Sequence, residues 1–319
     1  MQKIKIKNTD LPELSPFGLG TVNAGLSWDH EDAFKIFESY LAAGGNLIDT
    51  AHVYSDWIPG EIARAERVVG EWIRNRGHHD DFVLITKGGH PRNETMNISR
   101  MSKEEMTGDL DDSLKQLGVD CVDIYFYHRD DLNRSVEELI ETMEDFRRAG
   151  KIRYYACSNW TTKRMKEADE YARKMGYRGF VANQDMFNIG VKRMNPFSDP
   201  TMVVCDPEML EYHKNSDNLL MPYMGVCSGF FHLLKNKGID AVKDMCYNTE
   251  GNLKVADGIF KLCDEKGYTI TQALLGFFRV QDFDVLPLAS ADNMSQLEEL
   301  EKALNMEYDP KDYEFLKNC

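Results

Sequence analysis

The sequence has too few basic side chains for a protein whose main partner is a polyphosphate. Its 319 residues include 38 Lys and Arg against 53 Asp and Glu, a formal net charge of −15. Nucleic acids and anionic membranes are met by an excess of Lys and Arg. The balance therefore argues against both as partners, while one locally basic pocket for a phosphorylated cofactor stays compatible with it.

Cysteine pairs, an apolar leader and a long apolar run are also missing. The seven cysteines are scattered, odd in number and form no CxxC motif, which is typical of reduced thiols and not of a disulfide framework. Residues 1–5 contain no apolar core of a signal peptide. The most apolar stretch, 219–234, is interrupted by Pro222 and two glycines, so it is too short to span a bilayer. Together these absences predict a cytoplasmic protein.

The run His78-His79-Asp80-Asp81 contains four side chains of the types that bind metal ions. It falls in a short turn between a helix and a strand. Adjacent residues rarely ligate one ion together. We therefore expect a solvated turn and no metal.

What the sequence does contain is a regular alternation of short β-branched or aromatic runs with segments of helical period. A βα rhythm sustained over about 250 residues favours a closed (β/α)8 TIM barrel. We expect a β-hairpin, 3–6 with 11–14, before it, a long inserted loop, 190–218, before the seventh strand, and one domain over 1–319. The eight predicted strands are 17–21, 46–50, 82–86, 123–128, 153–158, 180–184, 219–223 and 284–287.

Chemically useful side chains stand at the ends of consecutive predicted strands, where barrel enzymes keep their active sites. Asp49 ends the second strand and Tyr54 follows in its loop. Lys87 ends the third strand, and His128 ends the fourth. Singly, each has a structural explanation, such as a turn cap, a solvated lysine or a core histidine. Their arrangement at successive strand ends predicts one catalytic site.

These motifs resemble the signatures of the aldo-keto reductase family in order and placement: Asp49-Thr-Ala-x-x-Tyr54, Thr86-Lys87, His128 in a Tyr-rich strand, and Ser158-Asn159. The resemblance runs from Thr9 to Leu297. It implies an oxidoreductase that moves a hydride between NAD or NADP and the carbonyl or alcohol of a small polar substrate, such as a sugar, polyol, aldehyde or ketone.

The resemblance assigns Tyr54 as the general acid and base. A phenol with a pKa near 10 is a reluctant acid, so a neighbouring cation must ease its ionisation. Lys87 supplies that charge, and Asp49 keeps Lys87 charged and oriented. His128 orients the carbonyl and stabilises the developing oxyanion.

The resemblance also implies cofactor contacts around the barrel. Ser158, Asn159 and Gln184 match the family's carboxamide clamp, and Tyr223 matches the aromatic residue that stacks on the nicotinamide. The remaining implied contacts are Gly20 and Thr21 beside the ribose, and Gly229, Ser290, Asp292 and Gln296 in the last cofactor segments.

The adenosine end of the implied cofactor site departs from the family pattern. Asp292 stands where NADP-binding members carry Arg or Lys, and Ser228 where relatives often place a basic residue near the pyrophosphate. Leu300 replaces the asparagine expected after Glu299. A carboxylate repels a phosphate and accepts hydrogen bonds from a ribose diol. The departures favour NAD over NADP, unless the loop is misaligned by one residue or Lys302 takes the phosphate role.

The substrate pocket is expected to be built from the loops that follow the strands. Arg129, with Asp130 and Asp131, points to a polar, hydroxylated substrate. Two other interpretations stay open: a nicotinamide-binding sensor or regulatory subunit with little turnover, and an unrelated barrel hydrolase or lyase. The sequence does not distinguish a monomer from a homo-oligomer. The expected pocket residues are Trp28, Trp57, His90, Arg129 and Trp160.

Overall fold

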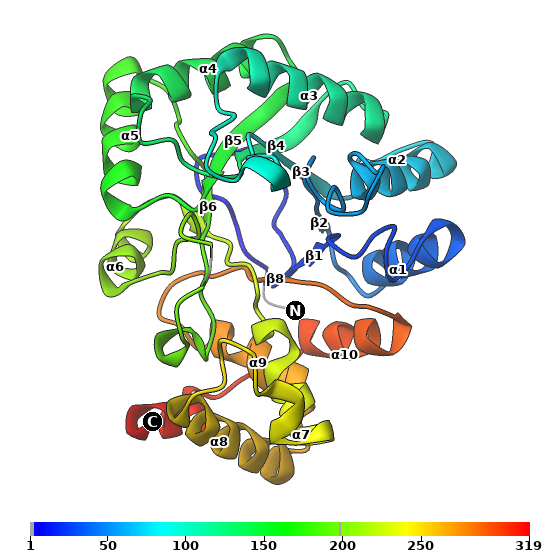
Figure 1. The fold of residues 1–319 in the computed structure, drawn as a ribbon, viewed down its shortest axis with the longest axis vertical. Coiled ribbons are helices and arrows are strands. Elements are labelled where there is room, and N and C mark those ends of the chain that lie inside the picture. The colour runs from blue at the N-terminus through cyan, green and yellow to red at the C-terminus, as the bar shows by residue number, and fades with distance from the viewer. Residues whose placement is uncertain (1–2, 198) are drawn as a thin grey trace.

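The computed structural model describes residues 3–197 and 199–319, and its central feature is one sheet of parallel strands that curls into a barrel (Figure 1). The strands follow one another in the order β7-β6-β5-β4-β3-β2-β1-β8. A parallel bridge between Leu220 in β7 and Val285, just before β8, closes the ring. The expected (β/α)8 barrel is confirmed. The strands are β1 Gly18–Gly20, β2 Leu47–Asp49, β3 Val83–Gly88, β4 Val122–Tyr127, β5 Ile152–Ser158, β6 Ala182–Gln184, β7 Leu219–Leu220 and β8 Leu288–Ala289.

Helices surround the barrel, and several begin at the capping residues that the sequence offers. At the start of α3, the Ser102 side chain accepts from the Glu105 backbone N–H, and Glu105 reaches back to the Ser102 backbone. This capping box satisfies donors that the first turn of a helix leaves free. The helices are α1 His30–Ala42, α2 Arg64–Arg76, α3 Lys103–Leu117, α4 Val136–Arg148, α5 Thr162–Met175, α6 Pro207–Asn215, α7 Phe230–Lys237, α8 Glu250–Lys266, α9 Ile270–Arg279 and α10 Met294–Leu304.

The expected N-terminal hairpin is present, but it is short and consists of a single antiparallel bridge. Ile4 and Leu14 exchange backbone hydrogen bonds of 2.9 and 2.7 Å. Their side chains are fully buried in the same cluster as Leu47, Val83 and Leu219, which begin or lie near the start of strands. The hairpin therefore seals the end of the barrel opposite the strand ends that carry the polar side chains.

The long loop predicted before β7 is partly helical. Its last third is α6, which begins because the Asp206 side chain caps the Met209 N–H and Pro207 fits the first turn. Before α6 lie the short turn Val191–Arg193 and an isolated parallel bridge between Met186 and Val204. This part of the loop reaches the site at Val203, whose N–H donates to Asn159 Oδ1 at 3.0 Å.

The segment between β7 and β8 is a helical annex. Figure 1 shows α7, α8 and α9 gathered with the C-terminal segment at one end of the molecule, beside the barrel. A separate apolar cluster holds this annex together, with Phe230, Phe231, Ile259 and Leu274 fully buried. No helix in 3–197 or 199–319 has the length and apolar character needed to cross a membrane.

Candidate active site

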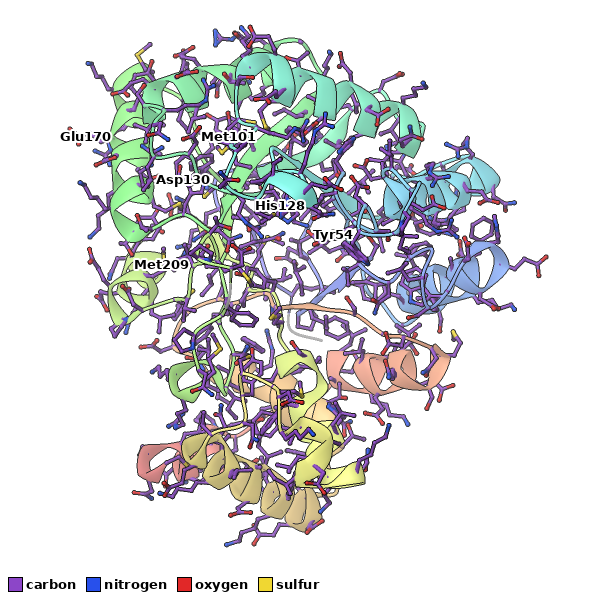
Figure 2. The ribbon with its side chains drawn as sticks, viewed as in Figure 1. Tyr54, Met101, His128, Asp130, Glu170 and Met209 are labelled. Atoms are coloured by element: carbon purple, nitrogen blue, oxygen red, sulfur yellow. The ribbon has the colours of Figure 1, made fainter. Side chains whose placement is uncertain are left out.

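Asp49, Tyr54, Lys87 and His128 meet at the carboxyl ends of β2, β3 and β4. Lys87 Nζ lies 2.7 Å from Asp49 Oδ2, 2.8 Å from the Thr50 carbonyl oxygen and 3.1 Å from Tyr54 Oη. The Tyr54 and His128 rings stand edge to face at 5.9 Å, and Figure 2 shows these two side chains as neighbours near the centre of the molecule. The fold thus brings all four predicted residues into one cluster.

The Lys87–Asp49 pair is buried, with side chains only 1% and 2% exposed. Burial by itself lowers the pKa of a lysine, yet the Asp49 charge and the hydrogen bonds to Asp49 and Tyr54 outweigh it and raise the Lys87 pKa. Lys87 therefore stays a cation. A cation held in this way can donate all three of its N–H groups in fixed directions.

Burial also raises the pKa of Tyr54 above the ordinary 10.0. The charge of Lys87 acts in the expected direction and lowers that pKa, but burial outweighs it and Asp49 adds to the rise. Tyr54 consequently holds its proton at neutral pH. The effect of Lys87 on the pKa thus has the sign expected from the sequence, and the cost of burying a phenolate outweighs it.

His128 is neutral in this environment. Burial lowers its pKa well below 6.5, and the nearby His90, Arg129 and Lys87 charges act in the same direction. His90, whose ring lies 4.8 Å from that of His128, has its pKa lowered to about 4 for the same main reason. His128 Nδ1 is buried and has no hydrogen-bond partner among the described residues. A neutral imidazole with an unused nitrogen suits a ligand that carries a carbonyl group.

Ser158, Asn159 and Gln184 lie side by side at the ends of β5 and β6 and bond one another. Ser158 Oγ donates to the Gln184 carbonyl oxygen at 2.7 Å, and Asn159 Nδ2 donates to Ser158 Oγ at 3.0 Å. Tyr223 closes over this group, since its hydroxyl donates to Asn159 Oδ1 at 2.7 Å. Gln184 Nε2 donates to Asp49 Oδ1 at 2.8 Å, a link across the barrel that strand-by-strand reading of the sequence had missed.

Asp185 is a residue of the site that sequence reasoning missed. Asn159 has a positive φ of 61°, a conformation that few non-glycine residues adopt. The Asp185 carboxylate accepts the Asn159 backbone N–H at 2.7 Å and so supports this turn. Burial raises the Asp185 pKa to about 7. The signal in the sequence was an acidic residue directly after Gln184, at the end of an apolar strand.

The segments after β1, β7 and β8 hold the other residues expected to bind the cofactor. Ser290 Oγ donates to the Gly20 carbonyl oxygen at 3.0 Å, and a side chain at Gly20 would crowd that hydroxyl at 2.8 Å. Thr21 Oγ1 is buried without a partner among the described residues. Gly229 lies at the start of α7 with a positive φ of 75°.

Asp292 and Gln296 form hydrogen bonds with neighbouring protein groups in this structure. Asn23 Nδ2 donates to Asp292 Oδ1 at 2.7 Å, and Ser27 Oγ does so at 3.4 Å. Gln296 Oε1 accepts the Asp292 backbone N–H at 2.6 Å. The Asp292 carboxylate thereby ties the β8–α10 loop to the loop that follows β1.

The geometry fits a nicotinamide cofactor. A carboxamide needs donors and acceptors together, and Ser158, Asn159 and Gln184 present both in one preassembled group. The unpartnered hydroxyl of Thr21 and ring nitrogen of His128 are buried polar atoms of the kind that a ligand usually satisfies.

Two tryptophans expected in the pocket are buried in this structure. Trp28 is 3% exposed, packs edge to face on Phe37 at 5.4 Å, and donates its indole N–H to the Ala291 carbonyl oxygen at 2.7 Å. Trp160 is fully buried against Tyr127 and Phe180. Their part in the pocket stays a prediction; in this structure each indole is buried and donates to a backbone carbonyl oxygen, Trp28 to that of Ala291 and Trp160 to that of Arg129.

Asp130 and Asp131 are also turned away from the site. Arg164 binds Asp130 with two bonds of 2.9 Å, and in Figure 2 Asp130 lies on the α5 side of His128, away from Tyr54. Asp131 caps its own turn by accepting from Asn133. These two aspartates therefore give no support to a hydroxylated substrate. Trp57 remains 49% exposed in the β2–α2 loop, and His90 and Arg129 lie beside His128.

His78, Asp80 and Asp81 come close enough for their ligand atoms to lie within 4.8 Å of one another. All three are exposed, and Asp81 is paired with Arg76. An exposed acidic turn of this kind is common without an ion.

The comparisons with known proteins agree with the class of enzyme that this barrel and its strand-end cluster define, an oxidoreductase of carbonyl compounds and alcohols. The chain belongs to the Aldo/keto reductase family, whose model matches residues 16–319. Members of this family use NAD(P)H as cofactor.

Curated relatives resemble the chain over most of its length. Norsolorinic acid reductase B of Dothistroma septosporum is 27% identical, over 89% of this chain and 73% of its own. Aryl-alcohol dehydrogenase [NADP(+)] of Phanerodontia chrysosporium is 24% identical, over 96% and 82% respectively. Among solved structures, a thermostable aldo-keto reductase in complex with the inhibitor epalrestat superposes with a TM-score of 0.72 at 20% identity, over 100% of this chain and 99% of that one. At that identity the structural likeness supports the fold.

Proposed function

We propose that the chain interconverts a carbonyl compound and an alcohol with a nicotinamide cofactor, and that Tyr54 is the general acid in reduction and the general base in oxidation. The observation that carries this proposal is the set of three hydrogen bonds that the Lys87 ammonium donates. Its three N–H groups are directed at Asp49, Thr50 and Tyr54. Tyr54 Oη therefore accepts a hydrogen bond from Lys87, and its own proton is free to be donated to a substrate oxygen.

The reduced cofactor, when bound, supplies the hydride. Ser158, Asn159 and Gln184 would hold its carboxamide, and the Tyr223 ring would lie against its nicotinamide. His128, neutral at physiological pH, donates a hydrogen bond to the carbonyl oxygen and orients it. As negative charge develops on that oxygen, the Tyr54 proton moves to it, and Lys87 stabilises the phenolate that remains on Tyr54. Asp49 and Gln184 keep Lys87 in position.

We propose NAD as the preferred cofactor. The β8–α10 segment 289–296 contains neither Lys nor Arg, and Asp292 occupies the position where a 2′-phosphate would need a positive charge. Ser228 supplies no charge near the pyrophosphate either. One relative is named for NADP(+). A preference of this chain for NAD would therefore have to come from its own residues at these positions.

We propose a small aldehyde or ketone with an aromatic or apolar body as the substrate. The loops after β1 to β4 expose Leu26, Trp57, Ile62, Ile98 and Leu132, and apolar side chains at this end of the barrel favour a ligand with apolar surface. The relative from Phanerodontia chrysosporium is named for an aryl alcohol. The alternative of a sugar or polyol has lost the support of Asp130 and Asp131, which turn away from the site.

A panel of benzaldehydes, aliphatic aldehydes, ketones and aldoses, run with NADH and with NADPH, tests this function. We expect oxidation of the cofactor with aromatic aldehydes, faster with NADH. Binding of NADH without single-turnover oxidation by any member of the panel would favour a sensor or regulatory subunit instead. Absence of cofactor binding would contradict the proposal altogether.

A further inference from the structure

Arg129 is a nearly buried cation at the mouth of the site. It follows His128 directly, and its side chain is 11% exposed. Its guanidinium is held by three contacts: Nε donates to Thr201 Oγ1 at 2.8 Å, Nη1 to the His128 carbonyl oxygen at 2.9 Å, and Nη2 to Asp199 Oδ2 at 3.2 Å. Two of these partners belong to the irregular loop between β6 and α6.

These contacts do not use the whole guanidinium. Arg offers five N–H donors in a fixed planar fork, and three are used within the described chain. One N–H on each terminal nitrogen has no acceptor there. Buried donors of a charged group are costly to leave unpaired. The guanidinium thus keeps one N–H on each terminal nitrogen for a further acceptor, and an arginine fork suits the oxygens of a carboxylate or phosphate.

The positive charge of Arg129 acts on the catalytic cluster itself. It contributes to the lowered pKa of His90 and of His128, and it opposes the burial that raises the pKa of Tyr54. The charge is therefore felt where a substrate carbonyl would be held. An anionic group on the substrate would meet it at short range beside buried side chains, where charge pairing is strong.

Asp199 is the counter-ion of Arg129, and it keeps other hydrogen bonds when its contact with Arg129 is broken. Its Oδ1 accepts from the Thr201 backbone N–H at 2.9 Å and from Thr201 Oγ1 at 2.6 Å. Its contact with Arg129 is the longest of the Arg129 bonds, and its side chain is 24% exposed. A stronger anion can therefore compete for the guanidinium while Asp199 keeps its own hydrogen bonds.

We propose that Arg129 binds an anionic oxygen group, a carboxylate or a phosphate, on the substrate, and that Asp199 holds the guanidinium in position when that group is absent. The proposal rests on the proposed function, since it assigns the substrate of the same site. It specifies a carbonyl compound that carries an acid, and makes Arg129 the residue that selects it.

Binding of simple anions tests the proposal independently of turnover. Benzoate, phenyl phosphate and the neutral benzamide are titrated calorimetrically into the chain, with and without NADH. We expect at least one anion to bind about tenfold or more tightly than benzamide. Arg129→Gln should reduce this preference to about twofold or less, and Arg129→Lys should leave an intermediate one, because the charge remains and the fork is lost. Asp199→Asn should increase the preference, since it removes the competing charge.

Arg134→Gln is the matched control. It removes one positive charge from the same loop, at a side chain that pairs with Asp131 and Glu138, and it should leave the preference unchanged. Each variant is checked for a wild-type unfolding transition. A wild-type chain that binds neither anion better than benzamide overturns the proposal, as does a preference that survives in folded Arg129→Gln or falls in Asp199→Asn.

A kinetic comparison separates this proposal from the proposed function. 3-Formylbenzoate and 4-formylbenzoate are compared with their neutral amides. Reduction of the amides with no gain for the acids in either pair would uphold the carbonyl reductase and overturn the Arg129 assignment. Anion binding that depends on Arg129, without reduction of any aldehyde, would uphold the Arg129 assignment and overturn the carbonyl reductase.

Discussion

Gln184 at the end of β6 donates its side-chain amide to Asp49 at the end of β2, and the same carboxylate holds Lys87. The residue expected to contact a nicotinamide carboxamide is thus bonded to the residue that orients Lys87. The proposed cofactor site and the proposed proton-donor site share one buried hydrogen-bond network, in which the loss of one partner is felt by the others.

Replacing Gln184 by Leu should therefore damage stability and catalysis together. It leaves one Asp49 oxygen buried without its donor, which costs about 1–3 kcal/mol of folding free energy, and it loosens the position of Lys87. Urea unfolding and steady-state turnover measure the two effects. Gln272→Leu is the control: Gln272 caps α9 through Thr269, so its loss should lower stability by about 1 kcal/mol with turnover unchanged. Normal turnover in Gln184→Leu would contradict the shared network.

The pH profile of aldehyde reduction follows from two opposite pKa shifts. Tyr54 must be protonated to act as the acid, and burial raises its pKa above 10.0. His128 must be neutral, and burial lowers its pKa well below 6.5. We expect kcat/KM for reduction to be flat between pH 6.5 and 10.0, the ordinary values of the two groups. An alkaline loss centred near neutral pH would show that Lys87 outweighs burial.

Replacing Glu66 on α2 should stabilise the fold in a pH-dependent way. It is fully buried, and burial raises its pKa from 4.5 to about 7. A folded-state pKa above the unfolded one stabilises the fold fully below pH 4.5, and this contribution is lost as pH rises through about 7. Glu66→Gln should then increase the free energy of unfolding at pH 8 by something on the order of 3 kcal/mol, and by little at pH 5.

Glu144→Gln supplies the contrast for Glu66. Glu144 is equally buried but accepts from Arg147 and Tyr155, so its neutralisation should destabilise the chain. Urea unfolding at both pH values measures both variants. If Glu66→Gln is as destabilising at pH 8 as Glu144→Gln, the burial argument for Glu66 fails.

The cofactor preference should depend on Asp292. In Asp292→Arg, a guanidinium replaces the carboxylate and can pair with a 2′-phosphate, so we expect the ratio of kcat/KM for NADPH to that for NADH to rise about tenfold or more. Asn23→Ala is the control, because it removes the partner of Asp292 and leaves the charge in place. It should not change the ratio. A wild-type chain that already prefers NADPH strongly would contradict the assignment.

The sequence predicted what depends on chain order and strand pattern. Apolar strands ending in Asp49, Lys87 and His128 had to place those residues at one end of a barrel, because parallel strands share their carboxyl edge. Which way a loop side chain turns depends on partners far along the chain. Trp28 turns inward because the Ala291 carbonyl oxygen accepts its N–H, and Asp130 turns aside to Arg164.

Long-range hydrogen bonds and the balance of opposing charges could not be predicted from the sequence either, because they too depend on partners far along the chain. The Gln184–Asp49 bond joins residues 135 positions apart, and no local pattern marks such a pair. The sign of the Tyr54 pKa shift required the degree of burial, which only the packed barrel supplies.

The Tyr54→Phe variant tests the central proposal most directly, with aldehyde reduction and NADH affinity measured on the same preparation. The account predicts a loss of kcat/KM of roughly 10²–10⁴, with the NADH dissociation constant changed by no more than about twofold. Tyr127→Phe, which removes a hydroxyl bonded to the Leu139 carbonyl oxygen, should keep normal turnover. Near-normal turnover in Tyr54→Phe would contradict the assignment of Tyr54 as the proton donor.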